Sequence, residues 1–259
     1  MNKELKKLTL WLNCNRLALN ISKTNFVIFA AVNKPRKNVT ILLGNKAIAE
    51  KTYVKYLGVL IDSKLKFKEH ISSVNKKIAR TVGLLYKLRH YMNQETLVMV
   101  YYSLIYPFLI YAVPIWGNAC ITFINPIHIL QKKVVRLIHF KDRSTHSAPL
   151  FNLLKILNIH DIHKLETLKF VFDCLHKTNP MQFHDYFTFS STNLNTAISR
   201  NNKLDTPQVR TTTYGLRSLK YSGAVSWNQI PEPIRSVTSR KLFTKQLKDL
   251  FVKSYIEQL

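Results

Sequence analysis

The sequence predicts an α+β protein that is mostly α: a small antiparallel sheet with one covering helix, then a helical bundle and a helical C-terminal region. Short apolar segments separated by polar turns occupy residues 25–62, which is typical of strands. From residue 67 onward, apolar residues recur three and four positions apart, the period of an amphipathic helix. The chain has 259 residues, 46% of them hydrophobic, which is enough to bury a substantial core.

The N-terminal part, residues 1–66, is expected to form a helix over 1–22 and then the sheet. A tight turn at 20–23 leads to a strand over 26–31 and a second strand over 39–43. Polar turns are expected at 33–38 and 44–46, because they hold proline, glycine, asparagine and lysine. A short strand from Ile48 and a strand over 56–61 complete the sheet. Gly58 in that strand allows either a bend with close backbone approach or a bulge.

Residues 67–140 are expected to be helical. The first helix has apolar positions at helical spacing between Ile71 and Leu88. Asn93 is expected to cap a second helix that starts at Gln94. A third helix is expected from Pro126 to 140, because proline suits the first helical position.

Residues 141–259 are expected to form a separate C-terminal region. It begins with a helix over 161–176, followed by a mobile linker near 178–206 that is rich in Asn, Ser and Thr. Ser239 is expected to cap a last helix over 240–256.

Charge is the strongest compositional clue to function. Lys and Arg number 39 against 14 Asp and Glu, a net charge of +25. Such an excess favours nucleic acid as partner, with a membrane surface or a merely soluble basic protein as alternatives. The first helix of 67–140 has no acid between Glu69 and Glu95, although an ordinary solvated helix face can show the same charge pattern. The candidate nucleic-acid-binding residues are Lys76, Lys77, Arg80, Lys87, Arg89, Lys132, Lys133 and Arg136.

The sequence offers no metal site and no intact catalytic site. It has no adjacent Asp–Asp pair, no P-loop and no Ser/His/Asp set, so no small-molecule substrate is expected. His160 and His163 have the spacing of a ligand pair, but a solvated helix face explains them better. Three scattered cysteines and the lack of a signal peptide indicate an intracellular protein, in the cytoplasm or nucleus, that is not secreted.

The uncharged segment 97–116 is long enough to span a membrane. Pro107, Pro114 and four tyrosines within it fit a buried, broken helix better, so a membrane is not the expected partner. The competing hypothesis is a non-enzymatic helical interaction protein, or a membrane-associated one, that uses this segment.

Two blocks carry a family resemblance: Trp11-Leu12-Asn13 with Leu19 to Phe29, and Tyr56 to Asp62. Together they resemble the end of the palm in reverse transcriptases of LINE-like, jockey-like non-LTR retrotransposons. The resemblance implies that residues 1–66 are the end of the palm, 67–140 the thumb that holds primer and template, and 141–259 the region after it.

The resemblance also implies residue roles. Lys23 is a candidate vestigial general acid, because the family's lysine at this turn faces the leaving pyrophosphate. Tyr56, Leu57, Gly58 and Val59 correspond to the primer grip. The Mg²⁺-binding aspartate pair of the intact enzyme comes before the first block, and this sequence starts at Met1 without it. The expectation is therefore a truncated RNA-directed DNA polymerase that is inactive alone, holds no cofactor and retains primer–template binding.

Overall fold

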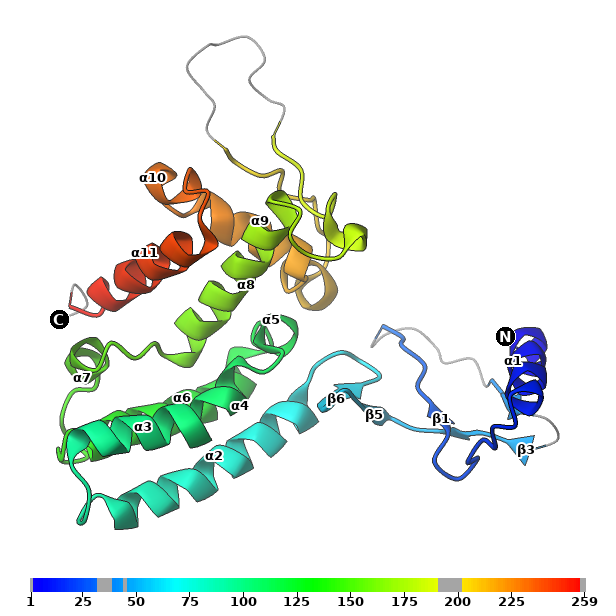
Figure 1. The fold of residues 1–259 in the computed structure, drawn as a ribbon, viewed down its shortest axis with the longest axis horizontal. Coiled ribbons are helices and arrows are strands. Elements are labelled where there is room, and N and C mark those ends of the chain that lie inside the picture. Colours follow the sequence, from blue (N-terminus) through cyan, green and yellow to red (C-terminus); the bar gives the residue numbers. More distant parts are fainter. Residues whose placement is uncertain (1, 32–38, 44–45, 191–201, 257–259) are drawn as a thin grey trace, which may run out of the picture. The chain divides into compact units, whose positions relative to one another are not determined.

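The computed structural model describes residues 2–31, 39–43, 46–190 and 202–256 (Figure 1). The turn expected at 33–38 and most of the one at 44–46 lie outside these residues. The chain divides into two compact units, residues 1–70 and 71–259, and helix α2 (Lys68–Leu88) begins in the first and continues in the second. Helices dominate and the strands are short, which confirms the expected mostly α, α+β class.

Helix α1 (Asn2–Cys14) opens the first unit and is shorter than the predicted 1–22 helix. It ends because Arg16 takes a left-handed backbone conformation, with φ of 54°, and the Leu17 amide returns to the Leu12 carbonyl. None of the residues of α1 is fully buried. The helix therefore covers the sheet only loosely.

In the described residues of the first unit, the strands form three two-stranded sheets in place of one antiparallel sheet. Strands β2 (Leu42–Leu43) and β3 (Lys46–Ala47) are antiparallel, as are β5 (Tyr53–Tyr56) and β6 (Val59–Asp62). Strand β1 (Asn25–Phe26) instead pairs in parallel with β4 (Ala49–Glu50). The strand predicted over 26–31 thus stops at Phe26, and the one predicted over 39–43 is reduced to β2.

The β5–β6 hairpin turns at Leu57 and Gly58. Both have positive φ, 44° and 85°, and Tyr56 pairs with Val59 across a two-residue loop. Positive φ at both central positions is the pattern of a type I′ turn, which matches the twist of the flanking strands. The strand predicted over 56–61 was therefore wrong at its start, and Gly58 serves the turn rather than a bulge.

The first unit has a small core. Ile41, Leu43 and Ile48 are buried, and Leu5, Ile21 and Phe26 pack against them. Asp62, the last residue of β6, fixes the loop that leads to α2 by accepting hydrogen bonds from the amides of Lys64, Lys66 and Phe67. So few buried side chains give the sheets little protection against local opening.

We expect backbone amides at 26–29 to exchange with solvent faster than those at 78–88. Strand β1 is two residues long, whereas Ile78 and Leu85 in α2 are fully buried. Hydrogen exchange followed by mass spectrometry or NMR measures this order directly. Slower exchange at 26–29 than at 78–88 would show that the first unit is the more stable one.

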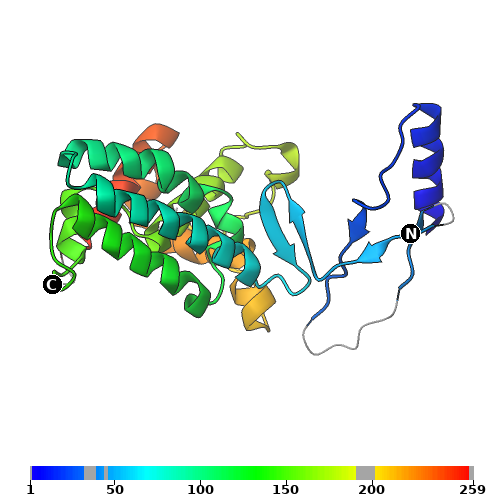
Figure 2. The ribbon, with the colours of Figure 1, turned by 90° about the horizontal axis from the view of Figure 1, so that it is seen from below.

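The second unit is a helical bundle in which α2 lies alongside α3 (Gln94–Leu104) and α6 (Ile121–Ile138) (Figures 1 and 2). Asn93 caps α3 as predicted, since its side-chain oxygen accepts from the Thr96 amide at 2.9 Å. Segment 97–116 is broken into α3, α4 (Tyr106–Ile110) and α5 (Val113–Trp116), with Pro107 and Pro114 in the first turns of the latter two.

Helix α6 begins at Ile121, so the start predicted at Pro126 was wrong. Proline lacks an amide hydrogen, so it cannot bond the carbonyl four residues earlier, and its ring crowds that carbonyl. That carbonyl belongs to Thr122, an exposed residue in the first turn. Absence of one bond there is inexpensive, because water reaches the free carbonyl.

Helix α8 (Ile159–Leu175) lies at the centre of the unit and packs against α4, α5, α6, α9 (Leu219–Asn228) and α11 (Arg240–Lys253). Residues 71–140 and 141–256 therefore share one core, and the boundary expected at residue 140 falls inside it. The remaining elements are α7 (Ala148–Leu153), the 3-10 turn η1 (Met181–Phe183), the π-helical turn η2 (Thr212–Leu216) and α10 (Glu232–Arg235).

Much of the segment predicted as a mobile linker is held in place. Phe189 and Leu204 form an isolated β-bridge, and Leu204 is buried. The Asn228 side chain bonds both the amide and the carbonyl of Leu204, at 2.8 and 2.9 Å. At Leu204 a polar side chain on α9 therefore supplies fixed hydrogen-bond partners within the segment predicted as a linker. Residues 191–201 lie outside the described part.

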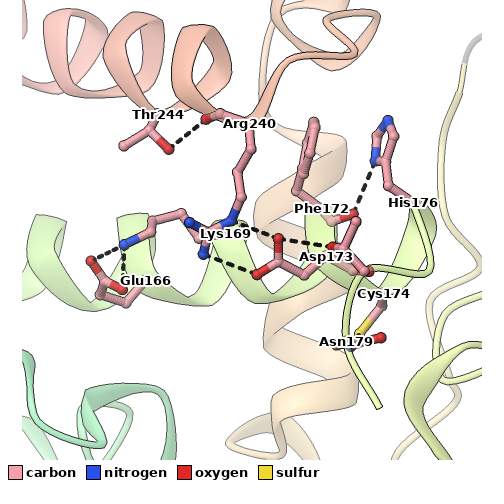
Figure 3. A network of polar contacts seen from close by, with 10 residues as sticks. Glu166, Lys169, Phe172, Asp173, Cys174, His176, Asn179, Arg240 and Thr244 are labelled. Atoms are coloured by element: carbon pink, nitrogen blue, oxygen red, sulfur yellow. Dashed lines mark hydrogen bonds and ion pairs between the residues drawn. The ribbon is translucent and has the colours of Figure 1, made fainter. Parts of the chain in front are cut away.

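An ion pair joins α8 to the start of α11 (Figure 3). The Arg240 guanidinium donates to both oxygens of Asp173, at 2.6 and 3.0 Å. Ser239 takes the N-cap position but makes no side-chain capping bond, contrary to the prediction. The first turn of α11 is instead anchored through this two-pronged contact to α8.

Candidate nucleic-acid interface

Three of the predicted basic residues form a stripe on α2. Lys76, Arg80 and Lys87 are all exposed. They are four and eleven positions apart along a helix that turns 100° per residue, so they share one face. The spacing alone produces this stripe, and Glu69 in the first turn is the single acidic residue of α2.

The other two basic residues of that region are held against aromatic rings. The Lys77 ammonium lies 5.2 Å from the centre of the Phe108 ring. The Arg89 guanidinium lies 5.9 Å from the centre of the Phe140 ring, just after the end of α6. A ring beneath a cation fixes its position without neutralising its charge, so Arg89 is placed towards α6.

A groove of about 580 Å³ lies between α2 and α6, and we call it the α2–α6 groove. Its apolar lining comes from Val82, Tyr86, Ile129 and Leu137. Six cationic side chains and a single acid, Asp142, line it as well. The cations are Arg89, Lys132, Lys133, Arg136, Lys141 and Arg143.

The segment after α6 is fixed by Arg136, whose Nε donates to the Thr145 carbonyl at 2.7 Å. This contact brings Lys141 and Arg143 to the groove that already holds Lys132 and Lys133. The structure thus gathers Arg89, three predicted cations of α6 and two that the sequence analysis missed. The sequence signal for Lys141 and Arg143 was their position directly after a basic helix.

The sequence analysis also missed the Tyr86 ring and Gly83, at which a Cβ atom would meet no other atom within 4 Å. Tyr86 is 54% exposed, and its ring meets the edge of the His90 ring at 6.2 Å between centres. Nothing in the apolar spacing of α2 distinguishes Tyr86 from an ordinary surface residue. Only the position of α6 shows that it faces a groove.

The predicted site residues of the first unit lie in two turns. Lys23 is exposed, and its amide donates to the carbonyl and side-chain oxygens of Asn20, both at 3.2 Å. Of the hairpin residues, Tyr56 and Leu57 are exposed, whereas Val59 is buried. Lys23 and the hairpin are thus both at surface turns of the same unit.

Within the described residues, no three His, Cys, Asp or Glu side chains are grouped to hold a metal ion. His163 was expected on a solvated face but is buried, and burial lowers its pKa to about 4. Burial also lowers the pKa of His128 to about 4, with Lys132 and His160 adding to the effect. These histidines are therefore neutral at pH 7 and serve packing.

None of the helices that the structure describes is both long and apolar enough to cross a bilayer.

Comparison with known proteins relates the chain to retrotransposon polymerases. It is 28% identical over 154 residues to a probable RNA-directed DNA polymerase from transposon X-element of Drosophila melanogaster, covering 58% of this chain and 17% of that protein. It is 30% identical over 126 residues to the RNA-directed DNA polymerase from mobile element jockey of Drosophila funebris, covering 47% and 13%. The jockey polymerase of Drosophila melanogaster is 30% identical over 132 residues, covering 49% and 14%.

The chain therefore spans less than a fifth of the length of these relatives. No family model matches it, and no solved structure matches it. The similarity confirms the resemblance to non-LTR retrotransposon reverse transcriptases that the sequence indicated.

Proposed function

We propose that this chain binds primer–template nucleic acid through the α2–α6 groove and the neighbouring stripe of Lys76, Arg80 and Lys87, and does not polymerise. The observation that carries the proposal is the grouping of six cations around one groove, with a single acid among them. Phosphate contacts supply most of the affinity of nucleic-acid-binding proteins, and such contacts need closely spaced lysines and arginines. The relatedness to RNA-directed DNA polymerases supports nucleic acid over other polyanions.

The hairpin of Tyr56 to Val59 supports the same proposal from the first unit. It presents Tyr56 and Leu57 to solvent at a two-residue turn, which suits a contact with a strand backbone. We infer that it corresponds to the primer grip of the related polymerases. Lys23 has a structural place in its turn and does not act as a general acid in this proposal.

Reversing two groove charges tests the binding proposal. We expect Lys132→Glu with Lys133→Glu to weaken binding to a labelled primer–template duplex at least tenfold. The log–log salt slope should fall by about 0.9 for each phosphate that the variant no longer neutralises. Fluorescence anisotropy at several salt concentrations measures both quantities.

The matched control is Lys241→Glu with Lys245→Glu, the same charge change on exposed positions of α11. If both double variants show the same drop in affinity and slope, net charge alone governs binding and the groove is not the site.

We expect no nucleotide incorporation by this chain on an RNA template with Mg²⁺ or Mn²⁺. Polymerases hold two metal ions on closely placed carboxylates, and the sequence has no adjacent aspartate pair. A primer-extension assay with purified protein measures incorporation. Template-dependent extension that a chelator abolishes would contradict this expectation.

A further inference from the structure

The α2–α6 groove combines two chemistries that a phosphate backbone alone does not require. Its cations, among them Lys132 and Lys141, suit phosphate oxygens. Its apolar lining of Val82, Ile129 and Leu137 suits a flat, uncharged group. A ligand that fits both has an aromatic ring directly attached to a phosphate-bearing backbone.

The groove is open over the exposed Gly83, and we call this open space the hollow. A Cβ atom placed on this residue would meet no other atom within 4 Å, and Gly83 lines the groove. By contrast, a Cβ on Gly117 in the same unit would lie 2.6 Å from the His163 ring. The absence of a side chain at Gly83 therefore leaves open space at the groove and is not forced by packing.

An aromatic ring stands beside this hollow. Tyr86 follows Gly83 by three positions on α2, so the two lie on adjacent parts of one helix surface. Tyr86 lines the groove and is half exposed, which leaves its ring accessible. Aromatic side chains beside cationic grooves are the usual platforms on which unpaired bases stack.

The volume of about 580 Å³ lies in the range of small-molecule pockets, roughly 300–1,000 Å³. A base inside a duplex is already stacked on both faces and presents only its edges and its phosphates. An unpaired base, in contrast, exposes a face that Tyr86 is placed to cover.

We propose that the α2–α6 groove holds one nucleotide of a single-stranded nucleic acid. The base occupies the hollow over Gly83 against Tyr86, and the adjoining phosphates lie on Lys132, Lys133 and Arg143. This inference rests on the proposed function and adds to it the recognition of an unpaired base.

The test compares four probes on the full chain: a single-stranded oligonucleotide, a duplex of the same sequence, inorganic polyphosphate and a mononucleotide. Tyr86→Ala removes the ring, and Tyr86→Phe keeps it. Gly83→Phe fills the hollow, whereas Gly83→Ala is the matched control that extends only into open space. Circular dichroism establishes that each variant is folded.

We expect Tyr86→Ala and Gly83→Phe each to weaken single-strand binding by about tenfold, the scale of one base stacked on an aromatic ring. The affinity of both variants for polyphosphate, and that of Tyr86→Ala for the duplex, should change by less than about twofold, because those probes offer no free base face. Tyr86→Phe and Gly83→Ala should bind the single strand like the unmodified chain.

Unchanged single-strand affinity in both Tyr86→Ala and Gly83→Phe would overturn the inference, as would an equal decrease for polyphosphate. If the mononucleotide competes as well as the single-stranded oligonucleotide at the same nucleotide concentration, the ligand is not a strand and the inference is overturned. Failure of the proposed function would give a different result. In that case the Lys132→Glu, Lys133→Glu variant would bind every probe with the same affinity as the α11 control variant.

Discussion

Replacing Gln131 by alanine is expected to lower the free energy of unfolding of the second unit by about 3 kcal/mol. Gln131 is fully buried on α6 and links three elements. Its Nε2 donates to the Tyr101 hydroxyl on α3 and to the Leu157 carbonyl, both at 3.3 Å. Its Oε1 accepts from the amide of Ile159, the first residue of α8, at 2.7 Å.

The cost arises because alanine leaves these groups buried without a partner. An unsatisfied buried polar group costs about 1–3 kcal/mol, and the smaller side-chain volume adds a cavity penalty. The first turn of α8 suffers most. Asn158 accepts from the amides of His160 and Asp161, so Gln131 is what serves the amide of Ile159.

Urea unfolding followed by tryptophan fluorescence measures the effect on the second unit. Trp116 and Trp227 are buried there, whereas Trp11 of the first unit is 57% exposed. Gln131→Met keeps the volume and removes the hydrogen bonds, so it separates the polar cost from the cavity cost. Lys133→Ala, two positions away on the exposed face, is the control. A decrease below about 1 kcal/mol for Gln131→Ala would show that water or neighbouring groups replace its bonds.

Acid is expected to destabilise the second unit by about 3 kcal/mol between about pH 6.5 and pH 4 through His163 alone. Burial, together with the smaller effects of His160 and Lys164, lowers the pKa of His163 to about 4 in the folded chain. The unfolded chain has an ordinary histidine pKa near about 6.5. Between these values the unfolded state binds a proton that the folded state does not, so stability falls as pH falls.

The surroundings of His163 leave little room for a charged, hydrated ring. The ring lies against Gly117, the C-cap residue of α5, and its Nε2 is 3.4 Å from the Thr167 hydroxyl. Each unit of pKa difference corresponds to about 1.4 kcal/mol, which sets the size of the expected destabilisation.

Urea midpoints measured at several pH values through this window give the slope. His163→Gln should flatten it, whatever its effect on stability at neutral pH, while His146→Gln on an exposed position should not. An unchanged slope in His163→Gln would assign the acid sensitivity to other groups, of which His128 is the first to test.

Elements that depend on neighbouring residues in the chain were predictable from the sequence. The apolar spacing of α2, the Asn93 cap of α3 and the breaks at Pro107 and Pro114 all appear as expected. Each is decided within a few residues, by helical periodicity, by one side-chain hydrogen bond or by the geometry of proline.

Elements that depend on distant partners were not predictable. Of the strand predicted over 26–31, only Phe26 pairs with β4, within the two-residue strand β1. The linker residues near Leu204 are ordered by Asn228, 24 positions away. His163 carries no sequence sign of burial, which comes from the packing of α5 against α8.

The candidate site divides in the same way. Its basic character, its lysines and arginines along two helices and its relatedness to retrotransposon polymerases could all be read from the order of the amino acids. The packing of α2 against α6 was needed to enclose one groove, to bring Arg89 to Lys132 and to open a hollow at Gly83 beside Tyr86. Charge and periodicity are properties of the chain, whereas a groove exists only once two helices pack and leave space between their side chains.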